Sequence, residues 1–273
     1  MTKLFWPATE MASWEAFLQH CAEVLRPGAY PPSHLFRSQA NASWPLTPTL
    51  VRRLRHPITP KRALEIEAAA LVEFQAQAHL YYPPAAPRGS ADEADLIAWW
   101  PLMQHHGAPT RLLDWTASPY VAAYFACEKE EDNDGAVYVV AREVLSSEYH
   151  SVFGETPMPA PHVLQDPAAP DVLLFFTPTR KTDRLAAQQG YFSISTHVLG
   201  DHDGTILRVC SRVAAGDASA RVFRKWIIPA RLKATFLRQL RVMNVIAQAL
   251  FPGLDGLARS INELVWLEAR RGT

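Results

Sequence analysis

Residues 102–126 constrain the fold of this chain more than any other part of it; they read LMQHHGAPTRLLDWTASPYVAAYFA. Within them, TRLLDWT has the branched and aromatic content of a short strand. Ser118 followed by Pro119 marks a helix start, because serine caps a first turn and proline fits its first position. The segment therefore predicts a strand that passes directly into an apolar helix. Its many polar side chains do not suit a plain core, so they require partners or a ligand.

The rest of the chain predicts an α+β fold in a single domain over residues 1–273, with a short-stranded, mostly antiparallel core flanked by helices. Apolar periodicity and helix-stop residues predict helices at 9–26, 61–80 and from 232 to 270, and a shorter one ending at Gly107. A proline-rich loop is expected over 150–170. Further strands are expected at HLFRSQ, AVYVVAREV, VLLFFTP, GYFSIST, GTILRVC and KWIIP.

The composition is that of an ordinary globular protein. The formal net charge is zero, which gives no reason to expect tight binding to bulk nucleic acid or to a membrane. No apolar run is long enough to span a bilayer. Cys21, Cys127 and Cys210 lie far apart, with neither metal-site nor disulfide spacing. We therefore expect a cytoplasmic protein without a metal, whose oligomeric state the sequence leaves open.

Strand alternation sorts the polar residues into faces. Asp114 and Thr116 share one face of their strand, and Arg37 and Gln39 share one face of HLFRSQ. If these faces meet, they form a polar cleft, and the helix that starts at Ser118 adds free backbone N–H groups that suit an anion. Arg37 and Asp114 have a second interpretation, as a buried ion pair that fixes strand order.

Other polar groups also allow two interpretations. Ser118 is explained by helix capping alone, and His105 and His106 by capping the carbonyls of the preceding helix. Residues 196–204, THVLGDHDG, hold two histidines and two aspartates, but a polar hairpin explains them with fewer assumptions than a metal site.

A third polar group is found in RLAAQQGYFSIST, residues 184–196. Gln188 and Gln189 precede a glycine and a strand in which Tyr191 shares a face with two serines. Two amides at a strand entrance can bind sugar hydroxyls. They can equally satisfy backbone groups at the edge of the sheet, so both interpretations stay open.

These segments, in this order, resemble the FRG domain family, which is named for a Phe-Arg-Gly motif. The resemblance runs through LFRSQANASWPLTPTLVRRL, residues 102–126, RLAAQQGYFSIST and ALFPGLDGLARSINE, and so covers residues 30–265. Ser38 stands where the glycine of the naming motif is expected.

The resemblance implies the layout of the ADP-ribosyltransferase superfamily, with a split-sheet core and NAD as substrate. That layout has an Arg or His on a first strand, a Ser/Thr-bearing strand that leads into an A-x-x-F-A helix, and a Glu or Gln before a later strand. Arg37 fits the first position, Thr116 and Ser118 the second, and Gln188 or Gln189 the third. Such enzymes cleave the nicotinamide–ribose bond of NAD, which requires precise placement of the pyrophosphate and ribose.

The resemblance also implies a role for each side chain. A guanidinium such as that of Arg37 suits phosphate, and Asp114 can stabilise positive charge. The expected catalytic residues are Arg37, Asp114, Thr116, Gln188 and Gln189, and the expected NAD-binding residues are Arg37, Gln39, His105, Arg111, Trp115, Ser118, Tyr120 and Tyr191.

The third position holds glutamine where transferases that modify macromolecules use glutamate. Glu65 and Glu67 form an E-x-E pattern, but they lie in an expected helix and are interpreted as a solvated face. The loss of the glutamate is compatible with an altered acceptor, with simple NAD hydrolysis, or with a binding fold without catalysis.

Two functions of different classes follow. The first is an NAD-consuming enzyme that modifies a nucleic acid or protein acceptor, as a toxin or antiphage effector. The second is a nucleic-acid-binding or regulatory module with a non-catalytic cleft. The segment between Ile206 and Val245 contains nine Lys/Arg and only one acidic residue, which favours a local anion-binding surface. Its candidate contacts are Arg221, Arg224 and Lys225, although a solvated surface also explains these charges.

Overall fold

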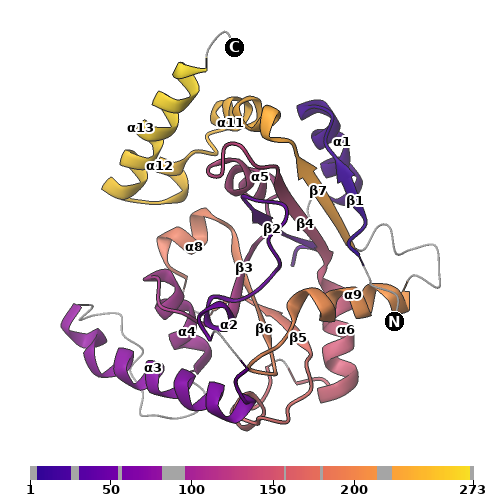
Figure 1. Ribbon diagram of the computed structural model, residues 1–273, viewed down its shortest axis with the longest axis vertical. Coiled ribbons are helices and arrows are strands. Elements are labelled where there is room, and N and C mark those ends of the chain that lie inside the picture. Colours follow the sequence, from indigo (N-terminus) through magenta and orange to yellow (C-terminus); the bar gives the residue numbers. More distant parts are fainter. Residues whose placement is uncertain are drawn as a thin grey trace.

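A seven-stranded sheet with helices on both faces forms the centre of the protein in the computed structural model (Figure 1). The structure describes residues 5–25, 31–54, 57–81, 96–156, 158–178, 181–213 and 223–270. The strand order is β1-β7-β4-β2-β3-β6-β5, and every neighbouring pair is antiparallel except β1–β7. The strands are β1 (Ala8–Glu10), β2 (His34–Gln39), β3 (Leu112–Thr116), β4 (Gly135–Ala141), β5 (Leu173–Phe176), β6 (Gly190–Ser195) and β7 (Phe223–Ile228).

The helices lie before, between and after these strands, so helix and strand segments alternate along much of the chain. They are α1 (Trp14–Val24), α2 (Thr49–Arg53), α3 (Pro60–Tyr81), α4 (Leu96–His105), α5 (Pro119–Cys127), α6 (Arg142–Phe153), α7 (Pro161–Leu164), α8 (Asp183–Ala187), α9 (His202–Val213), α11 (Lys233–Val242), α12 (Ala247–Leu250) and α13 (Leu254–Ala269), with a 3₁₀ turn at Ala230–Leu232.

Each face of the sheet has its own core, because side chains alternate along the strands. On β2, Phe36 packs with α1, α5 and α11, whereas its neighbour Leu35 packs with α6 and α9 on the opposite face. A third apolar cluster joins α3 and α4 to β3, β5 and β6. The expected α+β architecture, with a mostly antiparallel sheet flanked by helices, is therefore confirmed.

The pairing between neighbouring strands is shortest between β2 and β3. Their register contains one pair, Phe36 with Thr116, whereas β2 and β4 pair along the whole of His34–Gln39. The two strands diverge on either side of that pair, so four strands lie on one side of the seam and three on the other. This seam lies beside the strand–helix junction that the sequence marks as unusually polar.

Two expected elements in the last third of the chain are wrong. Residues 204–210, expected as a strand, belong to α9, and residues 196–204 form a turn that leads into this helix instead of a hairpin. The apolar residues Ile206 and Val209 are buried at helical spacing. A short apolar run fits both the two-residue repeat of a strand and the 3.6-residue repeat of a helix. Packing against the sheet selected the helix.

Residues 142–153 also differ from expectation. They were expected as the end of a strand and the start of a loop, yet they form α6, which buries Leu145 and Tyr149 one turn apart. At the N-terminus, Thr9 lies in β1, and Ser13 caps α1 by accepting a hydrogen bond from the Ala16 N–H. The Thr9 cap expected from the sequence is therefore wrong.

Cys21 and Cys127 are buried, and burial raises the pKa of each thiol to about 12, so both are inert. The side chain of Cys210 lies outside the described residues. Among the described helices, none combines the length and apolar character needed to cross a membrane.

Candidate functional site

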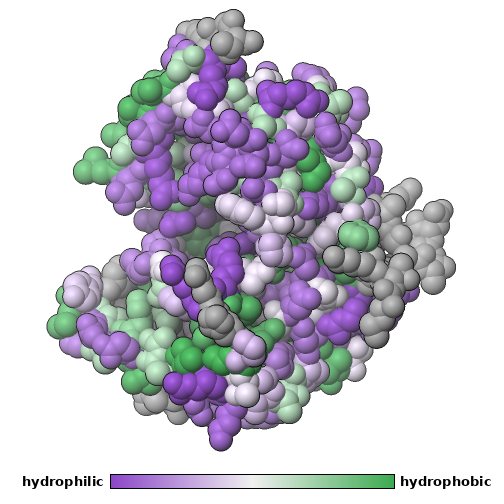
Figure 2. Space-filling view, viewed as in Figure 1, coloured by the Kyte–Doolittle hydropathy of each residue, from purple (hydrophilic) through white to green (hydrophobic). Residues whose placement is uncertain are grey.

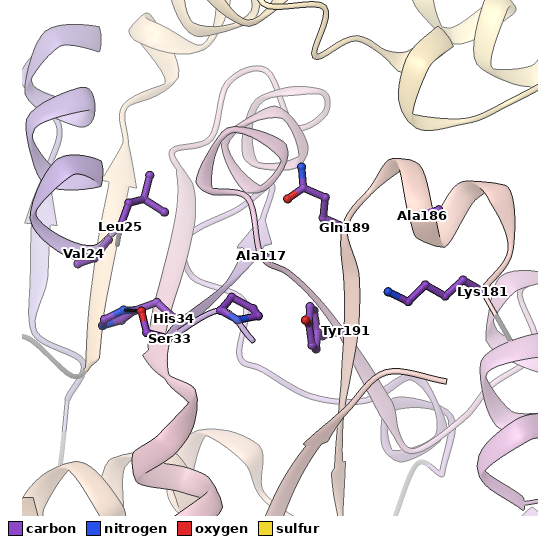
Figure 3. Close-up of a pocket in the computed structure, with 10 residues that line it drawn as sticks. Val24, Leu25, Ser33, His34, Ala117, Lys181, Ala186, Gln189 and Tyr191 are labelled. Carbon is purple, nitrogen blue, oxygen red and sulfur yellow. Dashed lines mark hydrogen bonds between the residues drawn. The ribbon is translucent and has the colours of Figure 1, made fainter. Parts of the chain in front are cut away.

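A cavity of about 430 Å³ lies where the start of β2, the end of β3 and the start of β6 meet (Figure 3). In Figure 3, Lys181 extends from the α8 side toward Tyr191, with His34 on the opposite side and Gln189 above. The cavity falls within the usual size range of small-molecule sites. It is lined by Val24, Leu25, Pro32, Ser33, His34, Ala117, Lys181, Ala186, Gln189 and Tyr191.

Strand direction explains why these segments meet. Because β2 and β6 are both antiparallel to β3, their starts lie at the edge of the sheet where β3 ends. The Ala117 N–H donates to the Gln189 carbonyl over 3.0 Å, which joins the two sides of the cavity. At Gly190, a Cβ would lie 2.2 Å from Leu185 Cδ1. Glycine therefore lets α8 close over the start of β6.

The lining combines polar groups of several kinds with an apolar wall. His34 Nδ1 lies 3.1 Å from the Ser33 hydroxyl, and Lys181 supplies an ammonium group. The described lining residues include an amide and a phenol but no carboxylate. This set suits an aromatic ring, hydroxyl groups and a phosphate in one ligand.

Thr116 and Ser118 lie behind the cavity and hold its shape. The Thr116 hydroxyl donates to the Gln188 carbonyl over 2.7 Å and accepts from the Ser118 N–H over 3.0 Å. The Ser118 hydroxyl accepts from the Val121 N–H, which is the cap expected from the sequence. Neither side chain is among those that line the cavity.

The two glutamines have different roles. The Gln188 side-chain amide donates to the Leu250 carbonyl over 3.0 Å, which ties the start of β6 to α12. Gln189 is exposed, has a φ of 48° in the turn before β6, and lines the cavity. Only Gln189 is therefore placed to contact a ligand there.

Arg37 and Asp114 do not meet as the sequence led us to expect. Phe36 pairs with Thr116, so Arg37 projects from the face opposite to that of Asp114 and Thr116. An Arg37 Nη1 donates to the backbone carbonyl of Asp114, and the Asp114 side chain is exposed. Burial lowers the pKa of Arg37, and the Asp114 carboxylate opposes this shift. Neither residue lines the cavity.

Gln39 and Trp115 belong to the core, which corrects their expected contact with NAD. The Gln39 amide donates to the Pro45 carbonyl over 3.0 Å. The Trp115 indole N–H donates to the Ser193 hydroxyl over 2.8 Å, and its ring packs against Phe175. Both side chains are buried, so neither is accessible to a ligand.

Arg111 is also buried, in an ion pair with Glu67 of α3. Its guanidinium lies 5.0 Å from the centroid of the Trp100 ring. The expected NAD contact of Arg111 is therefore not met, and the expectation of a solvated Glu67 is wrong. Glu65 does lie at the surface, where it pairs with Arg62.

His105 and Tyr120 both lie away from the cavity lining. The half-buried His105 ring packs edge-to-face against His106, and burial lowers its pKa. Tyr120, in the first turn of α5, packs against Trp14 and Phe17 of α1. Its ring joins two helices instead of facing a ligand. Of the expected NAD-binding residues, Tyr191 alone lines the cavity.

Two of the three candidate nucleic-acid contacts lie among the described residues, and they do not share a face of the sheet. Arg224 and Lys225 are adjacent on β7 and project from opposite faces. Arg224 pairs with Glu23, and Lys225 donates to the Ala42 carbonyl and lies over the Tyr138 ring. Arg221 lies outside the described residues.

The histidines and aspartates of residues 196–204 lie in the turn before α9 and in the first residues of that helix. The Asp203 carboxylate accepts from the Trp6 indole N–H and from the Leu46 N–H, and His202 is buried. Across the described residues, no group of three or more His, Cys, Asp or Glu side chains is arranged to hold a metal ion.

Sequence reasoning missed His34 and Lys181. His34 begins the strand HLFRSQ, and an Arg or His on the first strand was part of the expected layout, so His34 was a findable alternative to Arg37. Lys181 precedes α8 and has no distinctive local pattern. Its position depends on how α8 folds over β6.

Comparison with known proteins gives one family match, which lies in the first half of the chain. Residues 32–135 match the family model described as the FRG domain. This range contains β2, β3 and α5, and so two of the three strands that meet at the cavity, whereas β6 lies beyond it. No curated protein and no solved structure matches the chain.

Proposed function

We propose that this chain, which carries an FRG domain over residues 32–135, binds NAD in the cavity and cleaves its nicotinamide–ribose bond as an ADP-ribosyltransferase-like enzyme. One observation carries the proposal. A first strand, a strand–helix junction and the entrance of a later strand are the three places implied by the family resemblance, and they supply His34, Ala117 and Gln189 to one cavity.

The lining residues suit the parts of NAD. The Lys181 ammonium would pair with the pyrophosphate, and the Tyr191 ring would stack on nicotinamide. The imidazole of His34 and the amide of Gln189 would hydrogen-bond ribose hydroxyls and fix the sugar. The apolar wall formed by Val24 and Leu25 would limit the access of water.

The reaction breaks the bond between ribose C1′ and the nicotinamide nitrogen. Its electron pair leaves with nicotinamide, which departs as a neutral molecule, and the ribose develops oxocarbenium character. A nucleophile then bonds to C1′ and loses its proton. We propose a nucleic acid or protein as the acceptor, with water as the alternative nucleophile, and a role as a toxin or antiphage effector.

One observation favours a second candidate function. No carboxylate is among the described residues that line the cavity, so the group that usually stabilises the developing positive charge lacks a counterpart there. This favours a regulatory module that binds NAD or a similar nucleotide without turnover. Binding and bond cleavage must therefore be measured separately.

Calorimetry with NAD and a nicotinamide-release assay, with and without DNA, RNA and lysate protein, test the proposal. We expect Gln189→Ala to lower both binding and release by about tenfold or more. The matched control is Gln188→Ala, because its amide is directed to the Leu250 carbonyl and not into the cavity. NAD binding without release would support the second function. Failure of the folded protein to bind NAD would exclude the enzymatic proposal and any regulatory module that takes NAD as its ligand.

A further inference from the structure

The outer face of α13 is an apolar stripe. Its members recur at intervals of three and four residues, the spacing of a coiled-coil seam. The helix packs on the protein through Gly256, Ser260 and Leu267, on a face about 120° around the helix axis from the stripe. Figure 2 shows apolar surface at the upper left, where Figure 1 places α12 and α13. The α13 stripe consists of Leu254 (82 % exposed), Leu257 (40 %), Ile261 (51 %), Leu264 (38 %) and Val265 (65 %).

A groove of about 260 Å³ lies beside the C-terminal end of this stripe, between α11 and α13. Val242, Leu264 and Leu267 give it an apolar lining, and Glu268 lies at its edge together with Arg238 and Arg241. Leu254, the most exposed member of the stripe, lies at the other end of the helix. The helix therefore has a projecting apolar side chain at one end and an apolar hollow at the other.

We propose that α13 forms a homodimer in which the helices of two copies pack antiparallel, with a two-fold axis at Ile261. In this register Leu257 faces Val265, Leu264 faces Ala258, and Leu254 faces Glu268 and the groove of the second copy. Apart from Leu254, whose direct counterpart is Glu268, every apolar side chain of the stripe then meets an apolar side chain. The surface is self-complementary, as a closed two-fold interface requires. A second copy of this chain is therefore the partner that the stripe fits.

Charge favours the antiparallel direction. The N-terminus of α13 is capped by Gly253, which has no side chain to bond the free N–H groups of the first turn. The antiparallel register brings Glu268 of the second copy to this positive helix end, where the helix dipole favours a carboxylate although Asp255 already lies in the first turn. Parallel packing would instead set Glu268 against Glu268 and leave each groove without a facing Leu254.

The interface is small but sufficient. Burying the stripe on both copies removes on the order of 1,000 Å² of surface from water, which is the lower limit for a specific interface. Val242 and Met243 at the end of α11 are also exposed and extend the apolar surface beside the groove. We therefore expect a reversible dimer whose mass depends on protein concentration.

Sedimentation equilibrium of the purified chain over a concentration series tests the dimer. Ile261→Asp places two carboxylates together at the axis and should weaken dimerisation at least tenfold, since truncated central anchors cost about that much or more. The matched control is Val152→Asp on α6, which is 48 % exposed and should leave the mass unchanged. Unaltered thermal melting confirms that both variants fold. A monomer at every concentration, or a dimer that Ile261→Asp does not weaken, would overturn the proposal.

Cross-linking with a short bis-maleimide tests the register. The double variant Leu254→Cys with Glu268→Cys should link two copies, because these positions face each other across the axis. Within one helix they are roughly 21 Å apart, beyond the reach of a short linker. Leu254→Cys alone should give no link, because its counterpart lies at the far end of the interface. Equal cross-linking of the single variant would show parallel packing and overturn the proposed register.

Discussion

The Arg111 guanidinium and the Glu67 carboxylate form a bidentate ion pair that joins the residue before β3 to the middle of α3. Arg111 Nε lies 2.8 Å from Glu67 Oε1, and both side chains are buried. The pair holds the strand that leads to Thr116 and the back of the cavity. A buried pair of this kind is costly to break, because removing one charge leaves the other without a partner in a low-dielectric interior.

Glu67→Gln should lower the free energy of unfolding by about 3–5 kcal/mol, since it retains the shape of the side chain but leaves the Arg111 charge unpaired. Urea denaturation measures the loss. Glu65→Gln is the matched control two residues away, because Glu65 and Arg62 are solvent-exposed and such pairs contribute little. A loss for Glu67→Gln no larger than that of the control would contradict the structural role of the pair.

Lys233 is a second buried charge, and it holds two loops together. Its ammonium donates to the carbonyls of Ala40, Lys129 and Glu130 over 2.7–2.8 Å. Lys233→Met removes the donor of one buried and two part-buried hydrogen bonds and should cost about 2–3 kcal/mol, as chemical denaturation would show. Lys129→Met is the control, because it alters an exposed side chain and keeps the backbone acceptor. Equal effects of the two variants would refute this account.

His202 should make stability depend on pH. Burial lowers its pKa from an ordinary value of 6.5 to about 4, so the folded protein keeps the ring neutral where the unfolded chain binds a proton. The unfolded state therefore gains stability as pH falls from about 6.5 to 4, and the fold should lose about 3 kcal/mol over that window.

Urea denaturation of the protein and of His202→Gln at several pH values measures this contribution. The variant should show a shallower loss of stability on acidification, because its side chain does not titrate. His79→Gln changes an exposed histidine of α3 and should leave the pH slope as it is. Identical slopes for all three proteins would exclude His202 as the source.

Gly135 should resist substitution because β4 starts against α5. A Cβ at this position would lie 2.3 Å from the Ala126 carbonyl oxygen, and backbone cannot move aside as a side chain can. Gly135→Ala should cost about 1–3 kcal/mol. Gly204→Ala is the contrast, since its Cβ would meet the tip of the Asp201 carboxylate in the first turn of α9. Thermal melting should show a neutral or stabilising change there, and a tolerated Gly135→Ala would contradict the tight contact.

Elements with a strong local signal were predictable. The alternation in HLFRSQ gave β2 with its bounds, and Ser118 with Pro119 gave the start of α5. α9 and α6 were missed because short apolar runs fit both a strand and a helix, and only packing against the sheet chooses between them. The candidate site also combines features set by local sequence patterns with features set by packing. Its general place was predictable, whereas most of its expected side chains are occupied elsewhere.

The sequence by itself indicated three of the segments that meet at the cavity, because the strand HLFRSQ, a strand that enters a capped helix and a Gln-Gly strand entrance are local patterns. Only the tertiary structure decided which side chains line it: His34 and not Arg37, and Gln189 and not Gln188. The physical reason is register. Side chains change face at every residue, so the pairing of Phe36 with Thr116 decides what faces the cavity. That pairing is set by packing between segments far apart in the chain.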